Sequence, residues 1–485
     1  MKNRYKVAVS VILLLLAVDG TATAAESLTL RQTIQRVINN YPSLQIGKLQ
    51  LDKAAQEITR SNSQLGWQLN SSAGVSHDLG FTNAPVDSVT AGVGVQRQLK
   101  SGGTLGFQGG YQYQDNSVPF TGFPNPLTTT SADIEYRKPL GQGAGNPLYY
   151  QSSVGAESGL EIAKANHRGV LNQVVQQTVD LYYALATTQA SMRNAENAVA
   201  HAERLLEFVK KNERLGLAEK KDLLQAQAQL RAQRAALDGV KTAWEQQRTN
   251  LNRLMGRPWN EEVELTSIHS EGAVADTVDK YIAEAEALSP DINSLNEQLK
   301  IADAQLKVAK DKYKSKVDLV LSAGLRNGFG PMSSGPDFNK SDYAASAKIE
   351  YQRPLSRQGL EAEVYEAQIS QDIARRQIIK AKDDLRYQVE GLVSELGTGL
   401  TALNTSKARV DIEKEKLAET RERYRTGRAD TTQLIQFENE LSQAEFSVDQ
   451  QTLELARKQQ TLKLLRGVLW DELQLENTGL GAYKK

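Results

Sequence analysis

The sequence predicts a mainly α-helical protein with a membrane β-barrel part, made from an internally duplicated chain with long coiled-coil helices. Three observations lead to this fold class. Two stretches, about 158–215 and 357–426, are nearly free of proline and repeat apolar residues at helical spacing. Other segments alternate apolar and polar residues, as strands do. The two halves of the chain also align with each other.

The N-terminus, residues 1–24, is predicted to be a secretory signal peptide. Basic residues at the start precede an apolar stretch over 7–18, which is too short to span a bilayer as a helix. Small residues follow at the cleavage positions 22–24. An uncleaved membrane anchor is the less favoured alternative. Since no later stretch reaches the roughly 20 apolar residues of a spanning helix, the mature chain either stays soluble or enters a membrane as strands.

The composition argues against several function classes. The 58 basic residues balance 58 acidic residues, so no basic face for nucleic acid is indicated. The chain has no cysteine, which excludes disulfides, thiol nucleophiles and cysteine-bound metals. The four histidines lack metal-ligand spacing, and no glycine-rich phosphate loop precedes a helix. We therefore expect neither an enzyme nor a cofactor.

The internal repeat consists of two well-matched blocks. Residues 131–140 face 346–355 in a block of strand-like alternation, and a helical block is offset by 211 residues. Chance similarity among Ala- and Gln-rich helices could explain the helical block but not the strand block. The predicted organisation is a first repeat over 25–256, an equatorial linker over 257–277, a second repeat over 278–467 and a C-terminal tail over 468–485. Matched pairs of the helical block are Leu223 with Leu434, Leu251 with Leu462, and Gly256 with Gly467.

The predicted strands have one apolar face and one polar face. Leu105 and Phe107 alternate with Gln and Gly residues, which suits an apolar exterior and a water-filled interior; an ordinary soluble sandwich is the alternative. The first half carries an extra hairpin over 88–114, and whether it adds strands to the barrel stays open. One chain has too few strands to enclose a lumen, so several chains must share one barrel. The expected strands are 67–77, 88–99, 104–114, 129–138, 316–325 and 343–353.

The two long helices are expected to run roughly 85 to 105 Å. Helices of this length must pack along one another as a coiled-coil assembly. Two short helices stacked end to end span about the length of one long helix, so the lengths predict a hollow helical cylinder. A generic coiled-coil scaffold is the alternative, but it leaves the strands unexplained. The short helices are expected at 27–64, 218–255, 278–315 and 429–466.

The turns between the long and short helices carry the most specific pattern. A basic or aromatic residue precedes glycine, and an Asp or Thr, a Leu and a Gln/Ala-rich helix follow. With this pattern and the order of its elements, the chain resembles the TolC-like outer-membrane efflux family over essentially its whole mature length. The two copies read Arg214-Leu215-Gly216-Leu217-Ala218 and Tyr424-Arg425-Thr426-Gly427-Arg428-Ala429.

The resemblance implies a homotrimeric α-barrel/β-barrel channel in the outer membrane, with a long periplasmic portion and contact with outer-membrane lipid. Such a channel is the passive exit duct of a tripartite efflux pump or a type I secretion system. The two tip sequences would dock a periplasmic adaptor (membrane fusion) protein, which links the duct to an inner-membrane ABC or proton-driven transporter. A periplasmic coiled-coil scaffold without a pore is the alternative. The exported substrate and the pump class stay open.

The resemblance also implies a periplasmic entrance gate at the tips. Asp222 and Tyr424 occupy positions whose polar contacts hold the gate closed in the family. Gln433 and Gln436 stand where relatives often place acidic residues, so cation selectivity is not implied for this chain. We also expect Asp430 to cap the next helix, with Gln433 completing a capping box.

Overall fold

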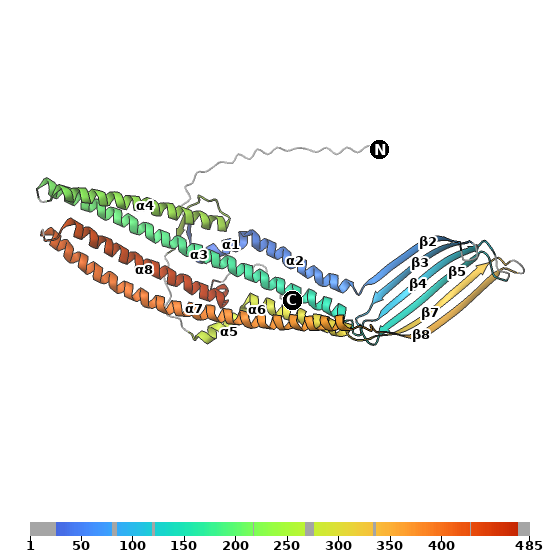
Figure 1. Cartoon of the computed structure of the whole chain (residues 1–485). Coiled ribbons are helices and arrows are strands. Elements are labelled where there is room, and N and C mark those ends of the chain that lie inside the picture. The colour runs from blue at the N-terminus through green and yellow to red at the C-terminus, as the bar shows by residue number, and fades with distance from the viewer. Residues whose placement is uncertain are drawn as a thin grey trace, which may run out of the picture. The chain divides into compact units, whose positions relative to one another are not determined.

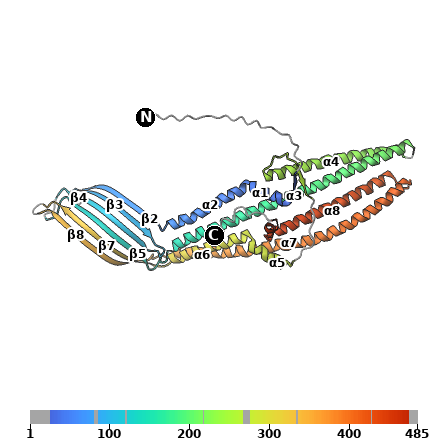
Figure 2. The same cartoon turned by 180° about the vertical axis from the view of Figure 1, so that it is seen from behind.

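The computed structural model describes residues 26–79, 85–118, 122–216, 218–266, 276–332, 336–426 and 428–473. The predicted signal peptide, Leu217, Gly427 and parts of the predicted linker and tail lie outside these residues. The described chain is mostly helical, with one large sheet (Figures 1 and 2). The helices are α1 (Leu30–Asn40), α2 (Pro42–Ser63), α3 (Pro147–Arg214), α4 (Lys220–Met255), α5 (Val278–Leu288), α6 (Pro290–Lys312), α7 (Gln358–Arg425), α8 (Thr431–Leu465) and α9 (Leu469–Glu472). The strands are β1 (Glu26–Leu28), β2 (Trp67–Asp78), β3 (Val86–Gln98), β4 (Thr104–Asn116), β5 (Leu127–Pro139), β6 (Val263–Leu265), β7 (Lys316–Gly330) and β8 (Phe338–Gln352).

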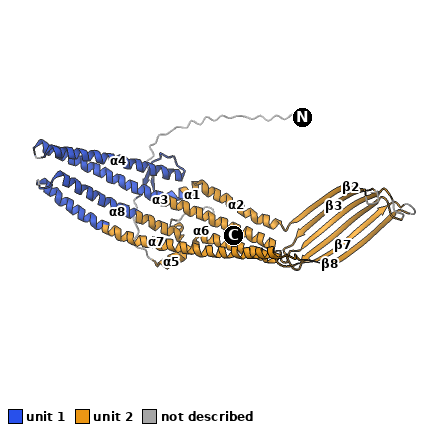
Figure 3. Ribbon diagram, viewed as in Figure 1, with its two compact units in different colours: residues 1–36, 180–270, 406–453 blue, residues 37–179, 271–405, 454–485 orange. Residues whose placement is uncertain are grey.

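The chain forms two compact units, coloured separately in Figure 3. The division falls inside α1, α3, α7 and α8. Unit 1 contains the two tip turns and the parts of the helices next to them, and unit 2 contains the large sheet. None of the helices in the described ranges is long and apolar enough to cross a membrane. Unit 1 comprises residues 1–36, 180–270 and 406–453, and unit 2 comprises residues 37–179, 271–405 and 454–485.

The two long helices are confirmed, and α3 and α7 each have 68 residues. At 1.5 Å per residue each is roughly 100 Å long. The predicted start of the first one, near residue 158, is wrong because α3 begins at Pro147. Asn146 accepts a hydrogen bond from the Tyr149 backbone N–H at 3.2 Å and so acts as the N-cap. Proline suits the first helical position because its missing N–H would be unpaired there anyway.

The predicted continuous helices over 27–64 and 278–315 are wrong, since each is divided in two. The breaks come at Tyr41 and Ser289, directly before Pro42 and Pro290. Proline lacks an N–H and clashes with the carbonyl four residues earlier, so it ends one helix and starts the next. The predicted linker also holds an unexpected strand, because β6 pairs in parallel with β1.

In unit 2 each short helix packs along a long one, as expected. The Tyr149 hydroxyl on α3 donates to Asn62 on α2 at 2.9 Å. Lys312 on α6 forms an ion pair with Glu363 on α7 at 3.0 Å. The pairs are therefore α2 with α3 and α6 with α7.

The large sheet has six antiparallel strands in the order β2-β3-β4-β5-β7-β8. All six predicted strands are present, and the extra hairpin forms β3 and β4 inside the sheet. Several strands run a few residues beyond their predicted ends. The sheet edges are β2 and β8.

The two faces of the sheet differ sharply in polarity, as the alternation predicted. One cross-strand row is entirely apolar, and the adjacent row on the other face is polar or glycine. In the single chain the apolar face is open, with Leu325 65% exposed and Tyr343 83% exposed. The apolar row is Leu69, Val95, Phe107, Ile134, Ala323 and Ala345, and the polar row is Gln68, Gln96, Gly106, Glu135, Ser322 and Ser346.

The turn between β3 and β4 depends on Gly102, whose φ is 90°. A Cβ atom at this position would clash with the carbonyl oxygen of Gly143. Replacing Gly102 by alanine is therefore expected to destabilise unit 2 by more than the roughly 1–3 kcal/mol that a strained backbone costs alone. Denaturant unfolding of the full chain measures this loss. Gly122→Ala is the matched control, since Gly122 has φ 93° and no atom within 4 Å of the added Cβ; equal losses in both variants would show that the contact with Gly143 is irrelevant.

Candidate functional site: the two helical tips

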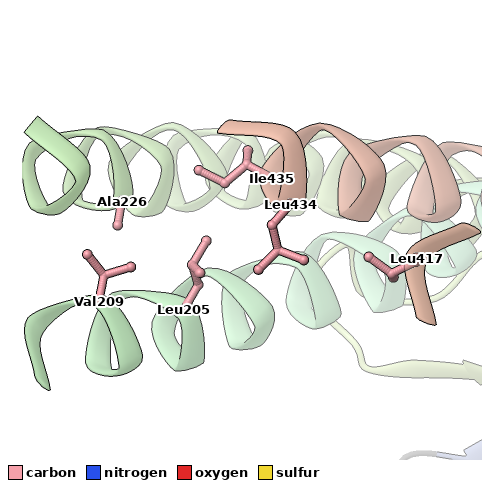
Figure 4. Close-up of a cluster of buried hydrophobic side chains, with 6 residues drawn as sticks. All are labelled: Leu205, Val209, Ala226, Leu417, Leu434 and Ile435. Atoms are coloured by element: carbon pink, nitrogen blue, oxygen red, sulfur yellow. The ribbon is translucent and has the colours of Figure 1, made fainter. Parts of the chain in front are cut away.

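Unit 1 contains two helical hairpins, α3 with α4 and α7 with α8, which we call the first and second hairpins (Figure 1). A single cluster of buried apolar side chains joins them (Figure 4). Both hairpins contribute to it, so the two tips are packed against each other rather than independent. The buried members are Leu205 and Val209 of α3, Ala226 of α4, Leu417 of α7, and Leu434 and Ile435 of α8.

The first tip is a tight turn after α3. The Gly216 N–H donates to the Glu213 carbonyl at 3.0 Å, and its φ of 75° favours glycine. The Glu219 N–H donates to the Asp222 carboxylate at 3.1 Å, which pairs an N–H at the start of α4. Asp222 therefore has a structural role at the helix start in addition to its predicted gate role.

The second tip is closed by different contacts. The Arg428 N–H donates to the Arg423 carbonyl at 2.8 Å, the long bond of a Schellman motif. The Gln433 N–H donates to Asp430 Oδ1 at 2.7 Å, so Asp430 caps α8 as predicted. Gln433 itself is exposed.

Tyr424 is the predicted gate residue with the most contacts between the hairpins. Its ring lies 5.6 Å from the ring of Phe208 on the first hairpin. Its hydroxyl is 3.0 Å from the hydroxyl of Thr431, which is buried. Burial raises the pKa of Tyr424, and the carboxylates of Asp222 and Asp430 act in the same direction. The phenol therefore stays neutral and able to hydrogen-bond across the physiological pH range.

Gln436 belongs to a charged network along the second hairpin. Its side chain donates to Glu440 at 2.9 Å. Glu440 pairs with Lys416 on α7, which also pairs with Glu413. The hydrogen bonds from Lys416 and Gln436 lower the pKa of Glu440, so the carboxylate stays ionised in mild acid. Asp222 thus lies near enough to Tyr424 for its charge to act on the phenol. Among the described residues, Gln433 forms no side-chain hydrogen bond with either of them.

The exposed side of α3 near the first tip forms a groove that the sequence analysis did not single out. Its central residues, Arg204, Phe208, Lys211 and Leu215, are spaced at i, i+4, i+7 and i+11, the spacing of a coiled-coil seam. Glu207, Lys210 and Arg214 flank the seam; we call these seven residues the α3 groove. The sequence signal that could have revealed this groove is the heptad spacing of its central residues just before the first tip.

The charges of the α3 groove are unpaired, unlike those of the second hairpin. Among the described residues, none of the four basic side chains of the groove forms an ion pair. On the second hairpin, by contrast, each arginine near the end of α7 has a carboxylate partner. The pairs are Arg421 with Glu438 at 3.1 Å, Arg423 with Glu419 at 3.9 Å and Arg425 with Glu422 at 3.1 Å.

The remaining predicted tip residues are accessible or close to the cluster. Leu215 is 62% exposed, and Arg214, Arg425, Thr426 and Arg428 are exposed. Ala218 packs against the buried cluster. No group of histidine, aspartate and glutamate side chains in the described part of the chain is arranged to hold a metal ion.

Comparison with known proteins gives one family and a consistent set of folds. Residues 104–257 match the family described as outer membrane efflux protein. The outer-membrane channel OprN superposes with a TM-score of 0.67 at 17% identity, over 91% of this chain and 90% of that chain. VceC, an outer membrane protein of Vibrio cholerae, superposes with a TM-score of 0.64 at 16% identity, over 90% of this chain and 96% of that chain.

The CmeC outer membrane channel of Campylobacter jejuni covers the largest share of this chain among the three. It superposes with a TM-score of 0.62 at 14% identity, over 97% of this chain and 94% of that chain. At these identities the similarity shows the fold alone. No curated protein sequence matches the chain significantly.

Proposed function

This chain is a member of the outer membrane efflux protein family, matched over residues 104–257, and from that premise we propose that three copies form an outer-membrane exit duct. The family is one of passive channels and not of enzymes. The duct would carry solutes from a periplasmic adaptor and an inner-membrane pump, of the ABC or proton-driven class, to the exterior. An efflux pump and a type I secretion system would use the same duct.

The observation that supports the membrane part of this proposal is the open apolar face of the six-stranded sheet. Large apolar side chains such as Leu69 (71% exposed) and Ile349 (70% exposed) have no cover in the single chain. Exposed apolar surfaces of this extent mark contact with a membrane or a partner. The polar row on the opposite face suits a water-filled lumen. A periplasmic scaffold without a pore would have no use for such a sheet.

Cell fractionation tests the proposed function. We expect the mature chain in the outer-membrane fraction, migrating as a trimer that heat converts to monomers. Recovery of a soluble periplasmic product would contradict the duct and favour the scaffold.

The two tips are the proposed adaptor-docking sites, and their charges suggest how they differ. The arginines near the end of α7 are paired with carboxylates, whereas the α3 groove leaves four basic side chains available. We propose that the α3 groove takes an acidic helix of the adaptor, with apolar side chains of that helix meeting Phe208 and Leu215. Six docking sites of two kinds would then surround the entrance of the trimer.

Reversing two charges of the α3 groove tests this docking. Lys211→Glu combined with Arg214→Glu is expected to abolish site-specific photo-crosslinking from position 207 to the adaptor in cells, because attraction becomes repulsion. Arg231→Glu combined with Lys241→Glu is the charge-matched control, since both residues are exposed on α4 and lie outside the groove. Acidic-to-basic changes in the crosslinked adaptor segment should restore the crosslink. A crosslink that survives the double reversal would contradict an acidic partner.

A further inference from the structure

We propose that the extra hairpin, β3 with β4, is part of the pore wall, so that three chains close an eighteen-stranded barrel. The trimer is taken from the proposed function, on which this inference rests. The strand order places β3 and β4 between β2 and β5 rather than at an edge or on a loop. Each chain therefore contributes six strands among its described residues, and three copies contribute eighteen.

The hairpin is paired along nearly its whole length on both sides. β3 is paired with β2 from Trp67↔Arg97 to Asp78↔Val86, and β4 is paired with β5 from Thr104↔Arg137 to Gln114↔Leu127. The Trp67 and Phe107 rings lie 6.0 Å apart, which ties β2 to β4 across β3. The hairpin is therefore an integral part of the sheet.

The two faces of the sheet continue through the hairpin without interruption. Val95 and Phe107 belong to the apolar row, and Gln96 lies in the polar row. Gln108 follows Phe107 and so lies on the polar face. A hairpin that folded away from the barrel wall would have no reason to keep this alternation in register with its neighbours.

The sheet edges point to a second copy of this chain as the partner of each edge. β2 offers 12 residues and β8 offers 15, and unpaired backbone groups of this number are not tolerated in lipid. β2 contains no proline and no charged side chain before His77, although exposed edges are normally protected by such residues. Because six is an even number of antiparallel strands, β8 of one chain meets β2 of the next in the antiparallel sense.

The number of strands sets the width of the exit. With strands about 4.8 Å apart and tilted about 40°, eighteen strands enclose about 36 Å between facing backbones. Without the extra hairpin, twelve strands would enclose about 24 Å under the same assumptions. The hairpin therefore widens the outer-membrane exit, which would admit bulkier solutes than a twelve-stranded barrel.

Cysteine labelling of the intact chain tests the proposal, since the natural chain has no cysteine. Single cysteines would replace Val95, Gln96, Phe107 or Gln108, with Ile134→Cys and Glu135→Cys on β5 as the reference pair. The full-length variants in outer-membrane vesicles are treated with a charged, membrane-impermeant thiol reagent. We expect positions 96 and 108 to react at least roughly tenfold faster than positions 95 and 107, matching the reference pair, because only the polar face meets water.

Equal reactivity of both faces of the hairpin, with alternation kept at 134 and 135, would overturn the eighteen-stranded barrel and leave the exit duct intact. Loss of alternation at the reference pair as well would overturn both proposals. A second measurement uses a chain lacking residues 85–116, in which β2 can pair directly with β5 in the antiparallel sense. Polymers of graded size, added from the extracellular side, are expected to enter the barrel of the native chain at sizes that the shortened chain excludes; the same size limit in both chains would contradict the proposal.

Discussion

Replacing Leu325 by arginine is expected to keep the chain out of the outer membrane. Leu325 lies near the middle of β7, is 65% exposed and shares a cross-strand row with Ala132 and Tyr343 on the apolar face. An arginine on the lipid side of a barrel costs about 2–4 kcal/mol at the bilayer midplane. In the proposed trimer three copies carry the change, so the cost for each assembly is three times that for one chain. Fractionation measures the share of the chain that reaches the outer membrane as a heat-modifiable trimer.

Ser322→Arg is the matched control for this prediction. Ser322 lies on the same strand but in the polar row, where it is within 2.8 Å of Ser346. A charge on this side would point into water, so assembly should remain close to that of the natural chain. Equal losses from both substitutions would show that the apolar face does not contact lipid.

Replacing Leu434 by alanine is expected to loosen both hairpins together. Leu434 is 6% exposed and packs in the cluster with Leu205 and Val209 of the first hairpin. Truncating a buried leucine costs about 2–5 kcal/mol, the amount depending on how well the site can collapse. Hydrogen exchange of the purified protein should therefore quicken at the end of α3 as well as at the start of α8.

Leu224→Ala provides the comparison, because Leu224 is 57% exposed on α4. A surface truncation of this kind is expected to change stability by less than about 0.5 kcal/mol. If Leu434→Ala quickened exchange in α7 and α8 alone, the cluster would not couple the two hairpins, and a shared entrance gate would lose its physical basis.

The strands were predictable because their pattern is local. Alternation with period two specifies both the strand and the side that each residue faces. Residues such as Leu105 and Gln96 therefore fell on the expected faces. The strand order could not be read in the same way, since the place of the extra hairpin depends on pairing between distant segments.

The helix breaks were missed although their signals are local. Apolar periodicity continues through Tyr41 and Ser289 and so indicates one unbroken helix, whereas the proline that follows each of them starts a new helix. Asn146-Pro147 is likewise an N-cap followed by a favourable first residue, and it marks the true start of α3. In a chain of long helices, proline is the better guide to where one helix ends.

The tip contacts could be predicted only in part. The glycine at 216 and the cap at Asp430 follow from turn and capping rules. The contact of Phe208 with Tyr424 does not, because it joins residues that are far apart in the sequence. Repeat symmetry also misleads here, since Lys210 and Arg421 occupy equivalent positions but only Arg421 has an ion-pair partner.

Single-channel recording on the purified full-length protein tests the central claim most directly. Reconstituted into a planar lipid bilayer, the protein should insert as trimers and give uniform conductance steps, one step for each trimer. The Leu434→Ala variant should give larger or more frequent openings, because it weakens the buried cluster that joins the two hairpins beside the proposed entrance gate. A preparation that is trimeric but never conducts, or that remains soluble without detergent, would contradict the account of this chain as an outer-membrane exit duct.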